Sequence, residues 1–287
     1  MRLSGTSVWL FCGVLLAVAP AALANITVAG SNVGTSYTII AGDVIDYGGF
    51  AVQVTDPGTL TMTGGDVSSA GGTGAGVYMT GGSFDMTAGI LGGGTSTGSG
   101  LHVRDGAATI GGSATLRGGT NSIGTGTGMH IDAGTVTVNG GTFYGGGSTG
   151  TGMNIRGGNV TVYSGTFYAG GSIGGAFDVS GGQLDVYGGV FHAAVNIRGG
   201  TTTIYGSAFS VDSVPVTTPL PYLVTGNTGT IDVTYLSGST ETITFNRFNQ
   251  DRGTLILVPE PATLSLLALG GLAMLRRRSE RWSGIVG

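Results

Sequence analysis

The 287-residue chain contains no lysine and a single cysteine, Cys12. The absence of lysine excludes nucleotide chemistry that depends on a P-loop lysine and any mechanism through a Schiff-base lysine. Cys12 lies within an N-terminal apolar run that we expect to be removed. The remaining chain then has neither a disulfide nor a thiol for catalysis.

Charge is also scarce. Only 9% of the residues are charged, and between residues 25 and 258 six arginines stand against thirteen acidic residues, a net charge of −7 with His neutral. Affinity for nucleic acid comes mostly from Lys and Arg at phosphates, so we expect no nucleic-acid partner. Gly-Gly-x-Gly-x-Asp calcium repeats are missing too, and no cofactor is expected.

The N-terminus has the three parts of a secretory signal peptide. Arg2 provides a basic start, residues 8–18 are apolar, and Ala22-Leu23-Ala24 fits a small-x-small cleavage site. We therefore predict a signal peptide over residues 1–24, a mature chain beginning at Asn25, and the export machinery as a partner. An uncleaved N-terminal anchor is the alternative interpretation.

What the chain has in abundance is glycine, 60 residues, interleaved with regularly spaced apolar triplets of the form apolar-x-apolar. The last residues of successive triplets are separated by 25, 24, 28, 24, 24 and 18 positions. The triplets are Val52–Val54, Val77–Met79, Leu101–Val103, Met129–Ile131, Met153–Ile155, Phe177–Val179 and Val195–Ile197. A second triplet follows each one, and then a weaker strand that follows a glycine pair. Alternation with a period of two is typical of strands, and glycine supplies the positive φ that tight corners need.

Three short strands recurring about every 24 residues predict an all-β fold, a right-handed parallel β-helix of about seven coils. We assign residues 25–50 to an N-terminal cap, 51–211 to the solenoid and 212–258 to a C-terminal cap with a β-hairpin around Ser237-Gly238-Ser239. In period and pattern this body resembles pectate-lyase-like enzymes and autotransporter passenger domains.

The repeat predicts which side chains stack on one another. Phe143, Phe167, Phe191 and Phe209 are expected to form an interior aromatic ladder, beside an aliphatic one of Val138, Val162, Val186 and Ile204. Tyr163, Tyr187 and Tyr205 are expected outside, at a corner. Arg104, Asp132 and Arg156 alternate in charge at one repeat position, which predicts a ladder of ion pairs between coils.

Few residues are candidates for chemistry. Three Gly-x-Ser-x-Gly segments start at Gly94, Gly146 and Gly170, but a nucleophile elbow needs a following helix, and none is evident. His102 and His130 share one outward position on adjacent coils and form the best candidate surface site. Two imidazoles lack obvious third and fourth ligands, so we predict no zinc or calcium site there. No pair of carboxylates stands out as catalytic.

The C-terminus reads Pro259-Glu260-Pro261, then an apolar segment over residues 262–275, then Arg276, Arg277 and Arg278. The order and the tripeptide resemble the PEP-CTERM domain of exported bacterial proteins, which would occupy residues 259–287. The resemblance implies an exosortase that recognises Pro259-Glu260-Pro261, transient insertion into the inner membrane, and Arg276–Arg278 as a cytoplasmic stop. Release to the cell surface or extracellular space would follow.

These features predict an exported protein of the cell envelope or extracellular matrix. We expect a structural, adhesive or carbohydrate-binding role, with exopolysaccharide as the candidate partner, and no catalytic activity. The alternative is a polysaccharide lyase or glycoside hydrolase on the same fold. A groove with two or more convergent carboxylates and an Arg or His would favour the enzyme.

Overall fold

The structure is a computed structural model that describes residues 26–28, 36–47, 49–119, 125–217, 221–248 and 253–259. The predicted signal peptide, Glu260, Pro261, the apolar segment 262–275 and the arginines after it lie outside these ranges. The described residues form strands and turns and no helix, which confirms the all-β prediction. They accordingly include no helix long and apolar enough to cross a membrane.

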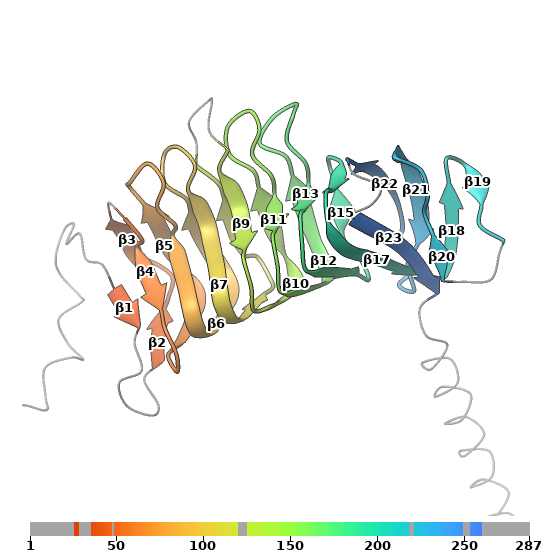
Figure 1. Cartoon of the computed structure of the whole chain (residues 1–287). Coiled ribbons are helices and arrows are strands. Elements are labelled where there is room, and N and C mark those ends of the chain that lie inside the picture. The colour runs from red at the N-terminus through yellow and green to blue at the C-terminus, as the bar shows by residue number, and fades with distance from the viewer. Residues whose placement is uncertain are drawn as a thin grey trace, which may run out of the picture.

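The strands form coils that follow one another along one axis from β1 at one end, and at the other end β22 and β23 lie next to the last coil while β18 and β19 lie farthest out (Figure 1). Their bounds are β1 Ile26–Val28, β2 Ser36–Ile39, β3 Val44–Tyr47, β4 Val52–Val54, β5 Thr59–Ser69, β6 Val77–Gly92, β7 Ser99–Ile110, β8 Thr115–Arg117, β9 Thr127–Ile131, β10 Thr135–Tyr144, β11 Met153–Ile155, β12 Asn159–Tyr168, β13 Phe177–Val179, β14 Gln183–Val186, β15 Val190–Phe191, β16 Val195–Ile197, β17 Gly200–Gly206, β18 Ala208–Val211, β19 Val214–Pro215, β20 Tyr222–Leu223, β21 Thr228–Thr234, β22 Thr240–Arg247 and β23 Gly253–Pro259.

Three faces of parallel strands build the solenoid. The predicted first triplets pair in register as the first face, from β4 through β6, β7, β9, β11 and β13 to β16. The second triplets pair in the same way as the second face, for example β10 with β12 and β12 with β14. Long strands such as β6 and β10 continue around a corner into the third face.

The solenoid has about six turns, slightly fewer than the seven predicted. The expected seventh turn begins with β16 and β17, but its third strand, β18, pairs antiparallel with β21 instead of continuing the parallel third face. At the other end β1 pairs in parallel with β4, and both β2 and β3 pair in parallel with β5. The described part of residues 25–50 thus continues the solenoid pattern.

Stacked apolar ladders fill the interior, as the repeat predicted. The rings of Phe143 and Phe167 stack with centroids 4.8 Å apart, and those of Phe167 and Phe191 with centroids 5.5 Å apart. Phe209 is buried as well. All four aliphatic residues predicted for the second ladder, from Val138 to Ile204, are buried. Because ladder residues of successive coils pack on one another, burial of apolar area holds the coils in register.

Glycine is required at the corners because the backbones of adjacent coils approach closely there. A Cβ added at Gly146 would lie 1.9 Å from the carbonyl oxygen of Gly119 in the preceding coil. Gly158 combines such an approach with a φ of +75°, in the left-handed region that favours glycine. The Gly-x-Ser-x-Gly segments lie in these turns and lead to further strands, so they are corners and not nucleophile elbows.

The predicted β-hairpin covers the C-terminal end of the solenoid. Strands β21 and β22 pair antiparallel around Gly238, whose φ is +85°. The end of β22 also pairs in parallel with β16, and β23 pairs in parallel with β17, so both faces are continued by the cap. Buried Arg247 donates hydrogen bonds to the carbonyl oxygens of Val224 (2.6 Å) and Gly253 (2.8 Å), which ties β22 to the segments beside it.

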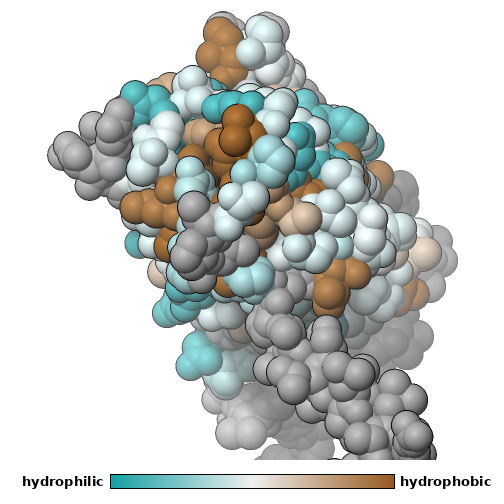
Figure 2. Space-filling model, turned by 90° about the vertical axis from the view of Figure 1, so that its right-hand side faces the viewer, coloured by the Kyte–Doolittle hydropathy of each residue, from teal (hydrophilic) through white to brown (hydrophobic). Residues whose placement is uncertain are grey.

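Figure 2 views the molecule from this end, where hydrophobic residues (brown) lie among hydrophilic ones (teal). Among the described residues of the C-terminal region, the exposed large hydrophobic residues are Val214, Leu223, Leu236 and Phe248. Phe248 is partly covered by the guanidinium of Arg198, which lies 4.1 Å from its ring centroid.

Candidate functional site

One row of polar and aromatic side chains follows the first face of the solenoid on the side away from the apolar ladders, and its members are half-buried except Asn196, which is buried. Strand register places its members one above another: Gln53, Tyr78, His102, His130, Asn154, Asp178, Asn196 and Asn246. The predicted shared position of His102 and His130 on adjacent coils is therefore confirmed. Their rings meet edge to face with centroids 4.7 Å apart.

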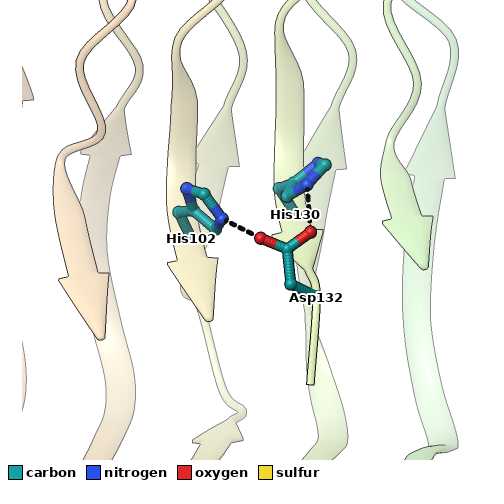
Figure 3. Close-up of side chains that lie close together, drawn as sticks. All are labelled: His102, His130 and Asp132. Atoms are coloured by element: carbon teal, nitrogen blue, oxygen red, sulfur yellow. Dashed lines mark hydrogen bonds and ion pairs between the residues drawn. The ribbon is translucent and has the colours of Figure 1, made fainter. Parts of the chain in front are cut away.

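Asp132 joins the two histidines into a cluster (Figure 3). Its Oδ2 lies 2.9 Å from Nε2 of His102 on β7, and its Oδ1 lies 3.1 Å from Nε2 of His130 on β9. Asp132 directly follows β9, two residues after His130, and residues i and i+2 of an extended chain face the same side. The carboxylate therefore lies between the two imidazoles. We call His102, His130 and Asp132 the histidine cluster.

The predicted ladder of ion pairs through Asp132 is wrong. Its carboxylate pairs with the two histidines, and Arg104 donates instead to the hydroxyl of Tyr78 at 3.2 Å. Nearer the C-terminal end of the same face, Arg198 pairs with Asp178 at 3.0 Å. The prediction considered only equivalent positions of the repeat. The extended chain, however, brings Asp132 to the same side as His130, two residues earlier.

The cluster is partly shielded from solvent, and this affects the pKa of two of its members. Burial lowers the pKa of His130, and the neighbouring His102 lowers it further. For Asp132, burial opposes ionisation, but the hydrogen bonds and the charge interactions with His102 and His130 together outweigh it and hold the pKa of the carboxyl below its ordinary value. At neutral pH the cluster thus contains a neutral His130 imidazole and a carboxylate.

A second candidate site begins at the predicted exterior tyrosine row, which is confirmed. The rings of Tyr163 and Tyr187 stack with centroids 5.2 Å apart, and those of Tyr187 and Tyr205 with centroids 4.2 Å apart. Tyr163 begins the row and is 52% exposed. Among the described residues its only stacking partner is Tyr187, so one face of the Tyr163 ring is not covered by another aromatic residue.

This row borders a groove of about 750 Å³ between the second and third faces. Residues from four successive coils line it, including Gly112, Asn139, Tyr163 and Tyr187, and the tip of the β21–β22 hairpin closes one side. The polar residues that line the groove are Asn139, Thr142, Ser164, Thr166, Ser237, Ser239, Thr240 and Glu241. We call it the tyrosine groove.

Glu241 is the one carboxylate in the lining of the tyrosine groove. Its Oε1 accepts a hydrogen bond from the backbone N–H of Phe191 at 3.0 Å, which fixes the hairpin against β15. Other carboxylates have different partners: Asp185 accepts from the Gln183 amide at 2.7 Å, and Asp178 is paired with Arg198. The sequence did not predict the groove, because Glu241 at the hairpin tip lies 50 residues after Phe191, which it contacts.

The sorting tripeptide begins at the end of the fold. Pro259 is the last residue of β23, pairs with Gly206 and is exposed, whereas Leu257, two residues earlier, is fully buried in the core. The first residue of the tripeptide thus lies where the chain leaves the solenoid.

Comparison with known proteins agrees with the resemblance of the tail. Residues 257–279 match the PEP-CTERM protein-sorting motif. No curated protein and no solved structure is significantly similar to the chain. The motif implies export, transient anchoring in the membrane and processing by an exosortase. The chain is therefore an exported protein with an exosortase sorting signal that begins within the last strand of a β-solenoid.

Proposed function

We propose that the chain is a structural protein of the cell envelope or extracellular matrix that binds polysaccharide in the tyrosine groove. The observation that carries the proposal is a groove in which an exposed aromatic ring face lies among many hydroxyl and amide groups. Sugars present apolar faces of C–H groups and a rim of hydroxyls. A site for them needs both an aromatic surface and hydrogen-bonding partners.

Tyr163 supplies the aromatic surface in this proposal. Tyr187 stacks on a ring on each side, which leaves only its edge for contact, and Tyr205 lies outside the lining of the groove. Tyr163 has a ring face without an aromatic neighbour, and it lines the groove beside Asn139 and Ser164. A sugar ring would lie on that face, and the side chains of Asn139 and Ser164 would bind its hydroxyls.

The groove favours binding over cleavage. Glycoside hydrolysis in most families needs two carboxylates on either side of the scissile bond. The lining contains one, that of Glu241, and it accepts the Phe191 N–H. Arginine and histidine are missing from the lining. These features support a binding protein over the polysaccharide lyase or glycoside hydrolase that the fold would also accommodate.

The two ends of the chain agree with a location outside the cell. We propose that residues 1–24 are removed as a signal peptide and that the exosortase removes the tail. The body from Asn25 to about Pro261 would then remain at the cell surface or in the matrix. Its net charge of −7 between residues 25 and 258 and its hydroxyl-rich surface suit contact with hydrated glycans.

The experiment is a glycan-array screen of the full-length protein in mild detergent, together with the exopolysaccharide of its native host. Tyr163→Ala should weaken binding of the selected glycan by about tenfold or more, which corresponds to about 1.4 kcal/mol. Tyr144→Ala is the matched control, because Tyr144 is also exposed and stacked, on Tyr168 at 4.9 Å, but lies outside the groove.

Polysaccharide cleavage is measured in the same samples by the release of reducing ends and of unsaturated sugars. We expect neither. Equal loss of binding in both tyrosine variants would contradict the groove as the site, and reproducible cleavage that Glu241→Gln abolishes would establish the enzyme instead.

A further inference from the structure

The histidine cluster combines the donor types of a transition-metal site. Each imidazole offers one ring nitrogen and the Asp132 carboxylate offers one oxygen, and these three atoms lie within 4.8 Å of one another. Within the described residues this is the one group of three or more His, Cys, Asp or Glu side chains that meets this condition. Two histidines and one carboxylate form a familiar ligand set for zinc and iron(II).

The distances suit a shared ion. Ligands about 2.0–2.1 Å from a tetrahedral zinc ion lie about 3.3 Å from one another. The two nitrogen–oxygen separations in the cluster are 2.9 and 3.1 Å. Binding would replace the two hydrogen bonds, which end on different oxygens of Asp132, by three or more metal–ligand bonds, one from each imidazole and the rest from the carboxylate. From the edge-to-face arrangement of the imidazoles, small rotations about the side-chain bonds of the two histidines would complete the geometry.

The side chains of the cluster are partly exposed, so a bound ion could keep one coordination position open to solvent. The relative exposure of the side chains is 24% for His102, 12% for His130 and 33% for Asp132. The ring edge of Tyr78 packs near His102 on one side. On the other side, in register with His130, lies Asn154, whose Oδ1 is buried without a hydrogen-bond partner. The cluster thus has shielding neighbours and still reaches solvent.

We propose that His102, His130 and Asp132 bind one divalent transition-metal ion of the zinc type, with a water molecule or a ligand oxygen in the remaining position. From the sequence we predicted no metal site here because third and fourth ligands were not evident. Asp132 supplies the third ligand. Calcium is disfavoured because it takes six to eight oxygen ligands, and two of the three donors are nitrogens.

Such an ion would connect two turns of the solenoid. His102 belongs to β7, whereas His130 and Asp132 belong to β9 and the residue after it. Because the ligands come from adjacent coils that come together only in the folded chain, the ion binds the native state and stabilises it. A free zinc concentration of 100 times the dissociation constant should raise the melting temperature by about 5–10 °C for a chain of this size.

The test is isothermal titration calorimetry of the full-length protein in detergent, first treated with a chelator and then titrated with zinc chloride. We expect one ion per chain. Removing a residue that supports a metal ligand typically weakens binding ~10–100-fold, so loss of a direct ligand in His130→Ala or Asp132→Asn should weaken it at least that much. His192→Ala is the control, because His192 stacks on Tyr168 at 4.3 Å and lies outside the cluster.

Asp132→Asn keeps the shape of the side chain and tests the site even if His130→Ala fails to fold. Titration of the chelator-treated protein with cobalt(II) adds an independent readout, since visible absorption bands report coordination by nitrogen and oxygen. Absence of stoichiometric zinc binding, or binding that both cluster variants retain, would overturn the proposal and leave Asp132 as a hydrogen-bonded link between coils. The glycan measurements have no part in this test.

Discussion

Replacing Phe167 by alanine tests whether the interior ladder stabilises the coils. Phe167 is fully buried, and its ring contacts three others, Phe143, Phe177 and Phe191, at centroid distances of 4.8, 4.5 and 5.5 Å. Loss of the buried ring removes about 2–3 kcal/mol of transfer free energy. The lost ring contacts and the cavity bring the expected total to about 3–5 kcal/mol.

The control is Tyr163→Ala, which removes a ring that is 52% exposed and has one stacking partner. About half of its area is already in water, so the expected loss is ~1 kcal/mol. The free energy of unfolding is measured by urea titration of the full-length protein in detergent, followed by circular dichroism and tyrosine fluorescence. Coincidence of the two signals establishes that a single free energy applies. Equal losses in the two variants would refute the assignment of interior and exterior faces.

Two further predictions concern a corner and the tyrosine row. Gly146→Ala should destabilise the fold by about 1–3 kcal/mol because its Cβ would lie 1.9 Å from the Gly119 oxygen. Gly72→Ala is the control and should be close to neutral, because the atom nearest to its Cβ would be the Cβ of Ser96 at 3.8 Å. Thermal unfolding of the two variants measures the difference. Burial and then the hydrogen bond with Tyr205 raise the pKa of Tyr187, so its contribution to stability is present below the unfolded pKa of about 10 and is lost as pH rises above it. Tyr187→Phe should therefore lose less free energy of unfolding between neutral and alkaline pH than the unmodified chain. An equal loss in the two proteins would contradict the role of Tyr187 ionisation.

The sequence predicted the body of the fold well because each coil repeats the same local solution. The triplets through Val54, Val138 and Val162 recur with a period of two inside a period of about 24, and only stacking of coils buries them all. The same alignment correctly placed Phe167 inside and Tyr163 outside. In a repeat protein, contacts between residues far apart in the sequence can be predicted, because equivalent positions of successive repeats are adjacent in space.

The sequence was less informative wherever the contact joins positions that are not equivalent in the repeat. Asp132 follows its strand and contacts His130 two residues earlier and His102 in the previous coil, so alignment with Arg104 and Arg156 gave the wrong partners. The tyrosine groove depends on a hairpin outside the repeat that contacts the coils through Glu241. The incomplete seventh turn has the same origin, since β18 pairs with that hairpin.

Mass spectrometry of the protein recovered from the surface of its native host tests most directly whether it is an exported solenoid released from a sorting tail. We predict an N-terminal peptide that begins at Asn25 and a C-terminal peptide that ends near Pro261. Because Leu255 and Leu257 are buried upstream of the cut, the released body retains its last strand. A surface form whose C-terminal peptide reaches Gly287 would contradict release and leave the chain as an anchored membrane protein.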